Sequence, residues 1–515
     1  MELLRQHLLT VLIFLPLLGA AAMLFLPNLR AVRAAALGTT GVSFLLSLLL
    51  LVPGLYDHSR PGTYAYESLG GVIQMVRAAD WIPSIHAQYL VGIDGLSLPL
   101  VILSTFVFVL ATAASWNQTK QPRGYFALLL LLETGVLGSF LSLDFLLFFV
   151  FFEISLLPMY FLIGIWGSSR REYAAIKFFL YTFVGSIAIL VALVAIGLRA
   201  GSFDLIELPL LLKAYAGTPW AMTMFVLLLI GFLIKLPAIP LHTWLPDAHV
   251  EAPTPVSMIL AAVLLKLGGY GLLRIAWPLF PAEALRLWPL VSTVAIVTIL
   301  GGALAALGQT DFKRLVAYSS VSHMGMVLLG IAMSTSMSVG GAIFMMVAHG
   351  VTSAALFFVV GVVYDRLHHR DLARMGGLAG SMPLYTRLAT LLMFASLGLP
   401  GLANFVGEIL VLLGTFGATH GSPVAGRYSA GGIYTVGVLA AFGLVLTAGY
   451  MLLAMQRVFL GERKESQPAL VDLDHRESLV LWPLVIVTVA LGIVPWATVL
   501  MFIDTTVTAL LKVLS

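Results

Sequence analysis

The sequence predicts an all-α, polytopic membrane protein of about fourteen transmembrane helices. Hydrophobic residues make up 60% of the 515-residue chain and charged residues only 10%, against roughly 25% charged in soluble domains. Apolar runs of about 20 residues, the length that crosses a bilayer as a helix, recur along almost the whole chain. The first run, residues 11–26, has no small-residue cleavage pattern, so we expect it to be a first span rather than a signal peptide.

The apolar runs place the expected helices in order along the chain. A polar insert rich in Gly, Pro and Ser, residues 54–90, separates the second helix from the third. No segment has the composition of a soluble domain. The expected spans are 7–26, 33–53, 91–115, 124–141, 143–167, 175–199, 219–241, 254–275, 287–306, 312–333, 338–363, 382–416, 432–458 and 478–510.

Charge and cysteine usage exclude several classes of function. The net charge of +4 comes from Lys and Arg in the connections between apolar runs, where they orient the chain, so it does not indicate nucleic-acid binding. Roughly sixteen of them fall on one side and about seven on the other, which predicts both termini on the outer side by the positive-inside rule. The absence of cysteine excludes iron–sulfur clusters, c-type haem attachment, zinc–thiolate sites and disulfides.

Several ionisable residues lie inside the expected spans. A charge at mid-bilayer costs about 2.5–3.5 kcal/mol or more, so each one marks a polar path or a functional site. Burial and neighbouring charges shift the protonation of Lys and Glu in opposite directions, which makes an alternating series suitable for proton transfer. The residues are Glu133, Glu153, Lys235, Lys266 and Glu408, with the histidines His323 and His349.

Two of these residues lie beside expected helix breaks. Pro237 follows Lys235, and Pro400 stands between Gly398 and Gly401 before Glu408. Proline removes a backbone donor and clashes with the preceding turn, and the freed carbonyls are tolerated in a membrane only where protein or water satisfies them. A broken helix with an ionisable residue in each half of the chain is typical of transporters built from inverted repeats. We therefore expect the first break to admit water to Lys235.

Structural roles remain open for many of the same residues. Glu153 with Lys235, or Glu133 alone, could lock two helices together, and His323 and His349 could make interhelical hydrogen bonds. A second group consists of loop and cap candidates: His242, Asp247, His249 and Glu251 could lie in a solvated loop, and Asp94 and Asp144 are explained as N-caps.

Long motifs then point to a family. FFEISLLPMYFLIGIWG, AAIKFFLYT, PLHTWLPDAHVEAPTPVSMILAAVLLKLGGYGLLR and TDFKRLVAYSSVSHMG resemble the antiporter-like, proton-translocating membrane subunits of respiratory complex I. That family also includes subunits of multisubunit cation/proton antiporters and membrane-bound hydrogenases. SIHAQYLVGIDGLSLPL, YDRLHHRDL before MGGL, and GLPGLANFVGE resemble its M (chain 4) branch, in which a glutamate, here Glu408, replaces the lysine typical of the L and N branches.

The resemblance implies an architecture. It comprises two inverted five-helix repeats, helices 4–8 and 9–13, with helices 7 and 12 broken. The expected domains are three N-terminal helices with the polar loop (1–118), a first repeat (119–280), a second repeat (281–465) and a C-terminal helix 14 (466–515).

The resemblance also implies roles for the buried residues. Glu153 would modulate Lys235, Lys266 would link the two repeats, and His323 and His349 would continue the axis to Glu408. Glu133 and His242 are further candidates for proton transfer.

The implied function is that of a proton-pumping subunit of NADH:quinone oxidoreductase. The chain would hold no cofactor, since NADH, FMN, iron–sulfur clusters and quinone would bind partner subunits. Its expected partners are other membrane subunits, especially the L and N types, and the lipid bilayer, with no nucleic acid. The expected location is a bacterial inner membrane with periplasmic termini.

Three alternatives remain. The nearest is a subunit of a sodium/proton antiporter or membrane-bound hydrogenase, which shares most of the motifs. A redox enzyme with haem or quinone bound by the intramembrane histidines would need paired histidines at matching depth. A purely structural scaffold leaves the buried lysines unexplained.

Overall fold

The computed structural model describes residues 2–52, 54–57, 72–420, 422–462 and 470–514. Within them, thirteen helices are long and apolar enough to cross a membrane. Two shorter apolar helices, Pro219–Lys235 and Ala403–Gly417, accompany them. The prediction of a helical membrane fold is therefore confirmed, while the number of crossings stays a prediction.

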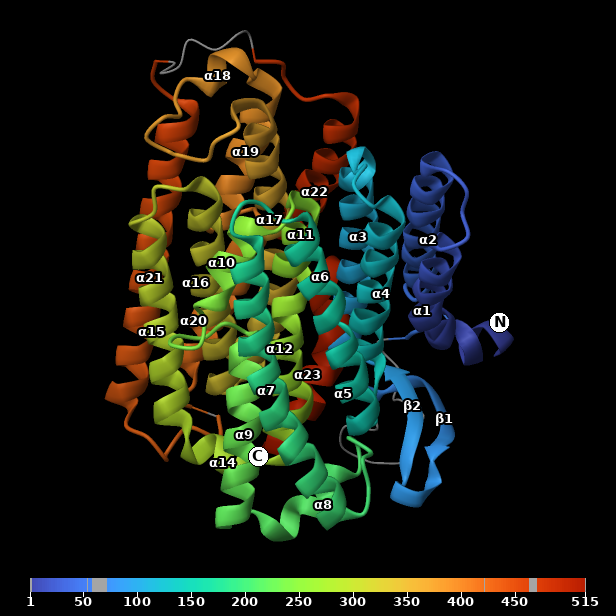
Figure 1. Cartoon of the computed structure of the whole chain (residues 1–515). Coiled ribbons are helices and arrows are strands. Elements are labelled where there is room, and N and C mark those ends of the chain that lie inside the picture. The colour runs from blue at the N-terminus through green and yellow to red at the C-terminus, as the bar shows by residue number, and fades with distance from the viewer. Residues whose placement is uncertain (1, 53, 58–71, 421, 463–469, 515) are drawn as a thin grey trace.

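Most of the helices run side by side in one bundle (Figure 1). In chain order the α-helices are α1 (Glu2–Met23), α2 (Leu29–Leu49), α3 (Ser97–Ala114), α4 (Pro122–Leu141), α5 (Phe145–Ile154), α6 (Leu156–Trp166), α7 (Arg171–Ala200), α8 (Leu208–Leu212), α9 (Pro219–Lys235), α10 (Trp244–Glu251), α11 (Thr254–Ile259), α12 (Leu265–Gly271), α13 (Trp277–Leu279), α14 (Pro281–Arg286), α15 (Trp288–Leu307), α16 (Phe312–Met333), α17 (Ser336–Leu367), α18 (Leu378–Ser381), α19 (Pro383–Ser396), α20 (Ala403–Gly417), α21 (Ala430–Phe459), α22 (His475–Ile493) and α23 (Met501–Leu514).

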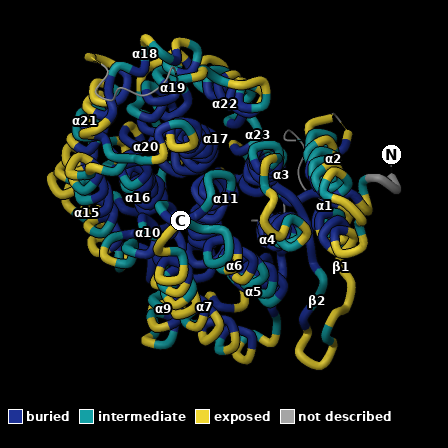
Figure 2. Tube along the Cα trace, turned by 45° about the horizontal axis from the view of Figure 1, so that its top comes forward, coloured by how far each residue is buried: buried dark blue, intermediate teal, exposed yellow. Residues whose placement is uncertain are grey.

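The bundle has a wholly buried centre. The most apolar windows of the stretch Thr254–Leu279 and of α17 are completely buried, and that of α16 is nearly so. In the outer helices α7 and α21 only 39% and 33% of the corresponding residues are buried, and Figure 2 shows the exposed positions on the rim of the bundle. Because the exposed outer surface is apolar and suited to lipid, we expect polar side chains within the spans to face the centre of the bundle.

A β-hairpin departs from the all-α prediction. Strand β1 (Gln74–Ile82) pairs antiparallel with β2 (Ala87–Ile93), and the hairpin lies at the lower end of the molecule in Figure 1. The third span, expected to begin at residue 91, consequently begins as a helix only at Ser97. Residues 91–93 are apolar because they are a buried strand end.

The expected helix over 478–510 is wrong as a single element. Helix α22 ends at Ile493, and a π-helical turn, η7 (Trp496–Leu500), leads into α23. Pro495 lies at this junction and has no N–H to continue the helical hydrogen bonds. Helix α23 packs against the centre, where Thr506 Oγ1 accepts a hydrogen bond of 2.9 Å from the Gly95 amide.

Two short backbone bridges lie at opposite ends of the bundle. Asp144 pairs with Asp204 beside the hairpin, and Asp311 pairs with Asp371 at the other end. In each bridge, the aspartate directly before a helix pairs with an aspartate in the connection that follows the next long helix. The two aspartates are the same number of residues apart in both bridges. The matching hydrogen bonds are Phe145 N to Phe203 O at 2.8 Å and Phe312 N to Arg370 O at 2.9 Å.

Both expected helix breaks are present. Helix α9 ends at Lys235, and eight residues of turns separate it from α10. Helix α19 ends at Ser396, and Gly398 and Gly401 adopt positive φ angles of 82° and 88° before α20 begins. A side chain satisfies one of the carbonyls at the first break, because Trp244 Nε1 donates a hydrogen bond of 2.9 Å to Ile234 O.

Candidate functional site

Lys266 and His349 form the centre of the site. Lys266 Nζ lies 2.8 Å from His349 Nδ1 and donates to Ala261 O at 2.7 Å. Lys266 lies between two π-helical segments, η5 (Leu260–Leu264) and η6 (Leu272–Ala276), and such widened turns are frequent at functional sites. Both side chains are buried, so the ammonium's only hydrogen-bonding partners among the described residues are a carbonyl and an imidazole.

His323 and Glu408 continue this line into the second half of the chain. The rings of His323 and His349 have centroids 5.3 Å apart. His323 Nε2 lies 3.5 Å from Glu408 Oε1 and 3.1 Å from Ser396 O. The Ser396 carbonyl is at the end of α19, so the second break supplies a polar partner for His323. Four of the expected residues therefore form a continuous series in space: Lys266, His349, His323 and Glu408.

Glu153 and Lys235 lie together at the other end of the line. The Ser186 hydroxyl donates to Glu153, and the Glu153 carboxyl also interacts electrostatically with Lys235. Lys235 is buried, with its Nζ 4.6 Å from the centre of the Phe152 ring. Among the described residues no ion pair joins the two side chains, so the modulating pair stays a prediction.

The first break and Lys266 are packed directly against each other. A Cβ added at Gly268 of α12 would lie 2.6 Å from Leu236 N, the residue after Lys235. Among the described side chains no hydrogen bond joins Lys235 to Lys266. The two lysines are connected only through the closely packed backbone of Leu236 and Gly268.

Glu133 and His242 lie off the line. Both carboxylate oxygens of Glu133 are buried on α4 without a hydrogen-bond partner in the described part of the chain. His242 lies in the first break, half-buried, with its ring 6.1 Å from that of Tyr318. No contact between either residue and the Lys266–Glu408 series is found among the described residues.

Sequence reasoning missed His249 and Lys313. The sequence leaves a solvated loop open for His249, but the residue lies on α10, is buried, and stacks on Phe357 with ring centroids 4.3 Å apart. Both of its ring nitrogens lack a partner among the described residues, and it interacts electrostatically with Lys313 and Lys266. The break before α10 could have signalled this position, because the second half of a broken helix returns into the bundle.

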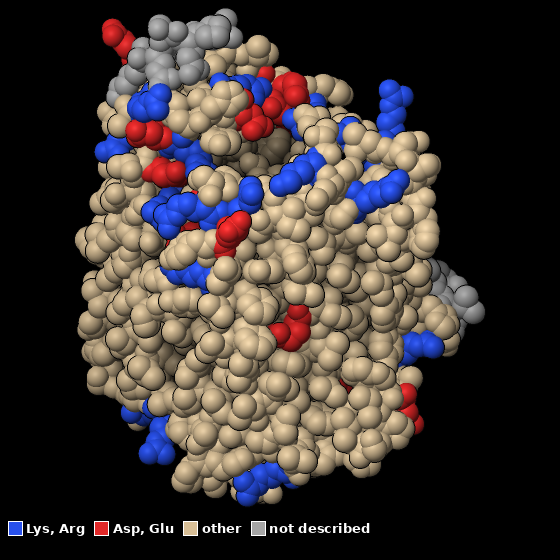
Figure 3. Space-filling view, viewed as in Figure 1, with Lys and Arg blue, Asp and Glu red and all other residues tan. Residues whose placement is uncertain are grey.

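Lys313 was counted among the charges that orient the chain. It is buried instead, and its Nζ donates to Ala252 O at 2.6 Å. It lines a cavity of about 280 Å³ together with Glu251, Asp365 and Arg370. Figure 3 shows the upper end of the molecule, where most of the visible charged side chains surround a hollow. We call this end the charged face, defined by Lys120, Arg170, Arg314, Arg366, Arg370 and Arg476.

The acids around the first break are ion-paired or hydrogen-bonded at the charged face. Asp247 bridges Lys177 and Arg314, with an N–O distance of 2.7 Å to each. Glu251 Oε2 accepts hydrogen bonds from the Ser168 hydroxyl and the Arg170 amide. The solvated-loop interpretation of these two acids is therefore replaced by a structural role in closing the bundle end.

The expected N-cap at Asp144 is confirmed, whereas Asp94 lies two residues before Leu96, the N-cap of α3, and has another role. Asp144 Oδ1 accepts from Leu147 N at 2.9 Å. Asp94 accepts from the Leu96 and Ser97 amides and also forms a fully buried ion pair with Arg274, at 2.6 Å. This pair ties α3 to η6, below Lys266.

The site offers ionisable side chains but no cluster suited to a metal. Among the described residues, no group of three or more His, Asp or Glu side chains could hold a metal ion. What the arrangement can do is pass protons between neighbouring bases, since a neutral imidazole accepts at one nitrogen and releases from the other.

Comparison with known proteins defines the class. Residues 142–426 match the family model described as "NADH:quinone oxidoreductase/Mrp antiporter, TM", and residues 63–141 match "NADH-ubiquinone oxidoreductase chain 4, amino terminus". The chain thus belongs to the antiporter-like class of membrane proteins.

Individual relatives narrow the class. NADH-quinone oxidoreductase subunit M of Rhodobacter capsulatus is 41% identical over 507 residues, covering 95% of this chain and 94% of that protein. NAD(P)H-quinone oxidoreductase chain 4 of Gloeobacter violaceus is 39% identical over 503 residues, covering 97% and 91%. The chain belongs to the subunit M (chain 4) family of NADH:quinone oxidoreductase.

Solved structures agree in fold. A chain of respiratory complex I from Thermus thermophilus superposes with a TM-score of 0.84 at 30% identity, covering 98% of this chain and all of that one. A chain of the Mrp complex from Dietzia sp. gives a TM-score of 0.82 at 21% identity, covering 99% of both. At that identity the second likeness concerns the fold alone.

Proposed function

We propose that this chain translocates protons across a membrane as a subunit of an NADH:quinone oxidoreductase, in which partner subunits transfer electrons from NADH to quinone. The observation that carries the proposal is the buried series Lys266, His349, His323 and Glu408, in which each side chain lies next to the following one. A structural scaffold would have no need for such a series, because buried ionisable groups are costly in a bilayer.

Each residue has a role that its contacts support. Lys266 passes a proton from Nζ to His349 Nδ1, and His349 releases one toward His323. His323 delivers it to Glu408, which is the terminal acceptor. When the Glu153 carboxyl turns away from Ser186, it stabilises the protonated form of Lys235. When the carboxyl turns back to Ser186, Lys235 releases its proton.

Proton uptake takes place from the charged face. The cavity beside Lys313 is lined by Val250 and Glu251, which follow His249 in the chain, and the His249 imidazole interacts electrostatically with both Lys313 and Lys266. Because the ring nitrogens of His249 have no hydrogen-bond partner among the described residues, they can bond to water and carry a proton between the two lysines. This adds a second uptake point to the one expected at Lys235.

The topology follows from the same proposal. The two matching backbone bridges at opposite ends of the bundle support two inverted repeats, residues 119–280 and 281–465. The positive-inside rule makes the charged face cytoplasmic, with periplasmic termini in a bacterial inner membrane. The neighbouring chains are the L- and N-type subunits, and the redox cofactors are held elsewhere in the complex.

The test compares proton uptake by NADH-energised inverted vesicles from wild type, Glu153→Gln and Lys235→Ala, with NADH oxidation followed in parallel. Lys235→Ala should abolish uptake, and Glu153→Gln should reduce it about a hundredfold, the lower end of what one positioned proton-transfer group contributes. Lys213→Ala, which removes an exposed lysine of a connection, is the matched control. Assembly is checked by native electrophoresis.

Full pumping by an assembled Lys235→Ala complex would refute the proposed axis. Repeating the assay with and without sodium separates the alternative, since sodium-dependent proton uptake would indicate an exchanger.

A further inference from the structure

A basic pocket at the edge of the charged face lies outside the proton axis. It is a cavity of about 410 Å³ between two connections, α1 to α2 and α3 to α4, and its lining includes Asn28, Gln121 and Arg123. Arg30 and Arg33 lie near the start of α2, and Lys120 lies in the α3–α4 connection. We call these four basic residues, Arg30, Arg33, Lys120 and Arg123, the basic pocket cluster.

The charges of the cluster are not neutralised within the described part of the chain. Three members donate hydrogen bonds to carbonyls: Arg33 to Gln118 O, Lys120 to Ile165 O and Arg123 to Pro27 O. The Arg33 guanidinium also lies 6.0 Å from the centre of the Trp116 ring. None of the four makes an ion pair with a described residue. The sequence explains why, because no Asp or Glu occurs between Glu2 and Asp57 or between Asp94 and Glu133.

The cluster differs in this respect from most of the charged face. At the first break, Lys177 and Arg314 share Asp247, and Arg366 is paired with Glu477. Those basic residues hold the bundle together. The positive charge of the basic pocket cluster is therefore available to an anion from outside the chain.

The surface beside the pocket is apolar. Leu18, Leu24, Phe25 and Leu45 on α1, α2 and their connection are each more than 60% exposed, as expected of positions that face acyl chains. Trp166, whose Nε1 donates to Lys120 O at 2.7 Å, lies at the level of the cluster. Tryptophan at this depth is typical of the membrane–water boundary, so the pocket lies at the height of lipid headgroups.

We propose that this pocket binds the phosphate headgroup of an anionic phospholipid, with the acyl chains lying along α1 and α2. Basic pockets between transmembrane helices on the cytoplasmic side are suited to such headgroups. The bound lipid would join the start of α2, which carries Arg30, to the start of α4, which carries Arg123, and so fasten the α1–α2 pair to α3 and α4. This inference does not depend on the proposed proton path.

The experiment uses the assembled complex in membranes supplied with phosphatidylglycerol that carries a photoreactive group near its headgroup. After illumination, chymotryptic peptides are mapped by mass spectrometry. We expect cross-links in residues 24–33 and 118–124. The double substitution Arg30→Gln and Arg123→Gln should weaken lipid binding about 30-fold, since each basic residue near an anionic headgroup contributes roughly a fivefold factor.

The matched control is Lys213→Gln with Arg286→Gln, which removes the same charge from exposed positions in other connections. It should leave the cross-links unchanged. Three results would each overturn the proposal: equal labelling in the double variant, equal labelling by a phosphatidylcholine with the same photoreactive group, or complete displacement by millimolar inorganic phosphate. The last would identify a site for free anions rather than for a lipid.

Discussion

At the scale of single residues, the buried ionisable groups are of two kinds. Some lie next to one another, and others accept hydrogen bonds from backbone amides. Lys266, His349, His323 and Glu408 face one another. Asp94 and Asp144 instead accept amide hydrogen bonds at helix starts. The residue types alone do not distinguish the two groups, because both are acids and bases inside apolar sequence.

Asp144 gives a prediction for pH dependence. It lies between α4 and α5, outside both spans, where burial raises the pKa of its carboxyl to about 6 against the hydrogen bonds from Gln88 and Leu147. The folded chain therefore binds more protons than the unfolded one between about pH 4 and pH 6, so this residue's contribution to stability falls as pH rises through that window. Asp144→Asn should flatten the decline in Tm measured between pH 4 and 7.

The control for this prediction is Asp80→Asn, at an exposed position of β1, which should leave the slope of Tm against pH as in wild type. An Asp144→Asn variant with the wild-type slope would contradict the prediction.

At the scale of secondary-structure elements, the two broken helices matter most. Each break places a charged residue beside freed backbone: Lys235 ends α9, and Glu408 lies against the turn that follows α19. In the second break, a Cβ at Gly398 would lie 2.1 Å from Glu408 Oε2. Gly398 is therefore required both by its backbone angle and by the carboxylate next to it.

A glycine pair tests this geometry. Gly398 and Gly401 both have positive φ, but nothing lies within 4 Å of a Cβ built on Gly401. Gly398→Ala and Gly401→Ala should each cost about 1–2 kcal/mol in backbone strain. Only Gly398→Ala should also displace Glu408, so proton uptake should fall strongly in that variant and stay near wild type in Gly401→Ala.

Vesicle proton uptake and Tm, measured on both alanine variants, separate strain from displacement. Equal losses of uptake at matched stability would show that the position of Glu408 against Gly398 is unimportant.

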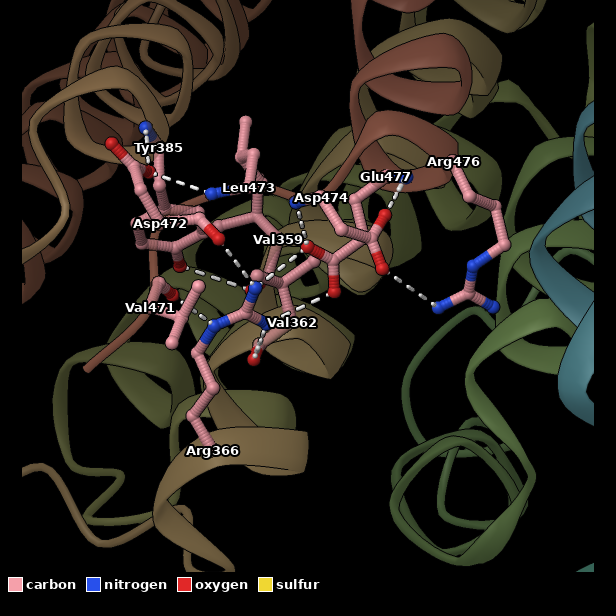
Figure 4. A network of polar contacts seen from close by, with 10 residues as sticks. All are labelled: Val359, Val362, Arg366, Tyr385, Val471, Asp472, Leu473, Asp474, Arg476 and Glu477. Carbon is pink, nitrogen blue, oxygen red and sulfur yellow. Dashed lines mark hydrogen bonds and ion pairs between the residues drawn. The ribbon is translucent and has the colours of Figure 1, made fainter.

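At the scale of the whole molecule, the fold holds its polar groups in the centre and at the charged face. The charged face is fastened by a network around Arg366, at the end of α17 (Figure 4). Arg366 bonds to both Glu477 oxygens, at 2.9 and 2.6 Å, and to the Val471 and Asp472 carbonyls. Asp472 in turn accepts the Leu384 and Tyr385 amides at the start of α19. The network therefore joins α17, α19 and α22.

A double-mutant cycle measures this network. Arg366→Gln should lower the free energy of unfolding by about 3 kcal/mol, because it leaves Glu477 as a nearly buried charge without its partner. Glu477→Gln in the same background should recover part of that loss, since glutamine keeps the capping box with Asp474. Thermal unfolding of the four proteins gives the coupling, and strict additivity would exclude a direct interaction.

Much of the fold and of the candidate site was predictable from the sequence. Apolar length predicts helices, Pro237 and Pro400 predict the two breaks, and buried charge identifies all four residues of the central series. The β-hairpin was not predicted, because its strands lie in a polar insert and at the edge of an apolar run. The division at Pro495 was missed because the flanking sequence is apolar throughout.

What the sequence by itself determined is the membrane environment, the helical class and the set of candidate residues, since these follow from the cost of placing charge in hydrocarbon. The tertiary structure alone decided which of them meet. Lys266 and His349 are far apart in sequence and come within 2.8 Å because α17 packs against the π-helical segment before Lys266. His249 and Lys313 became candidates in the same way, because only the folded chain turns α10 back into the bundle and buries a lysine that the sequence places in a connection.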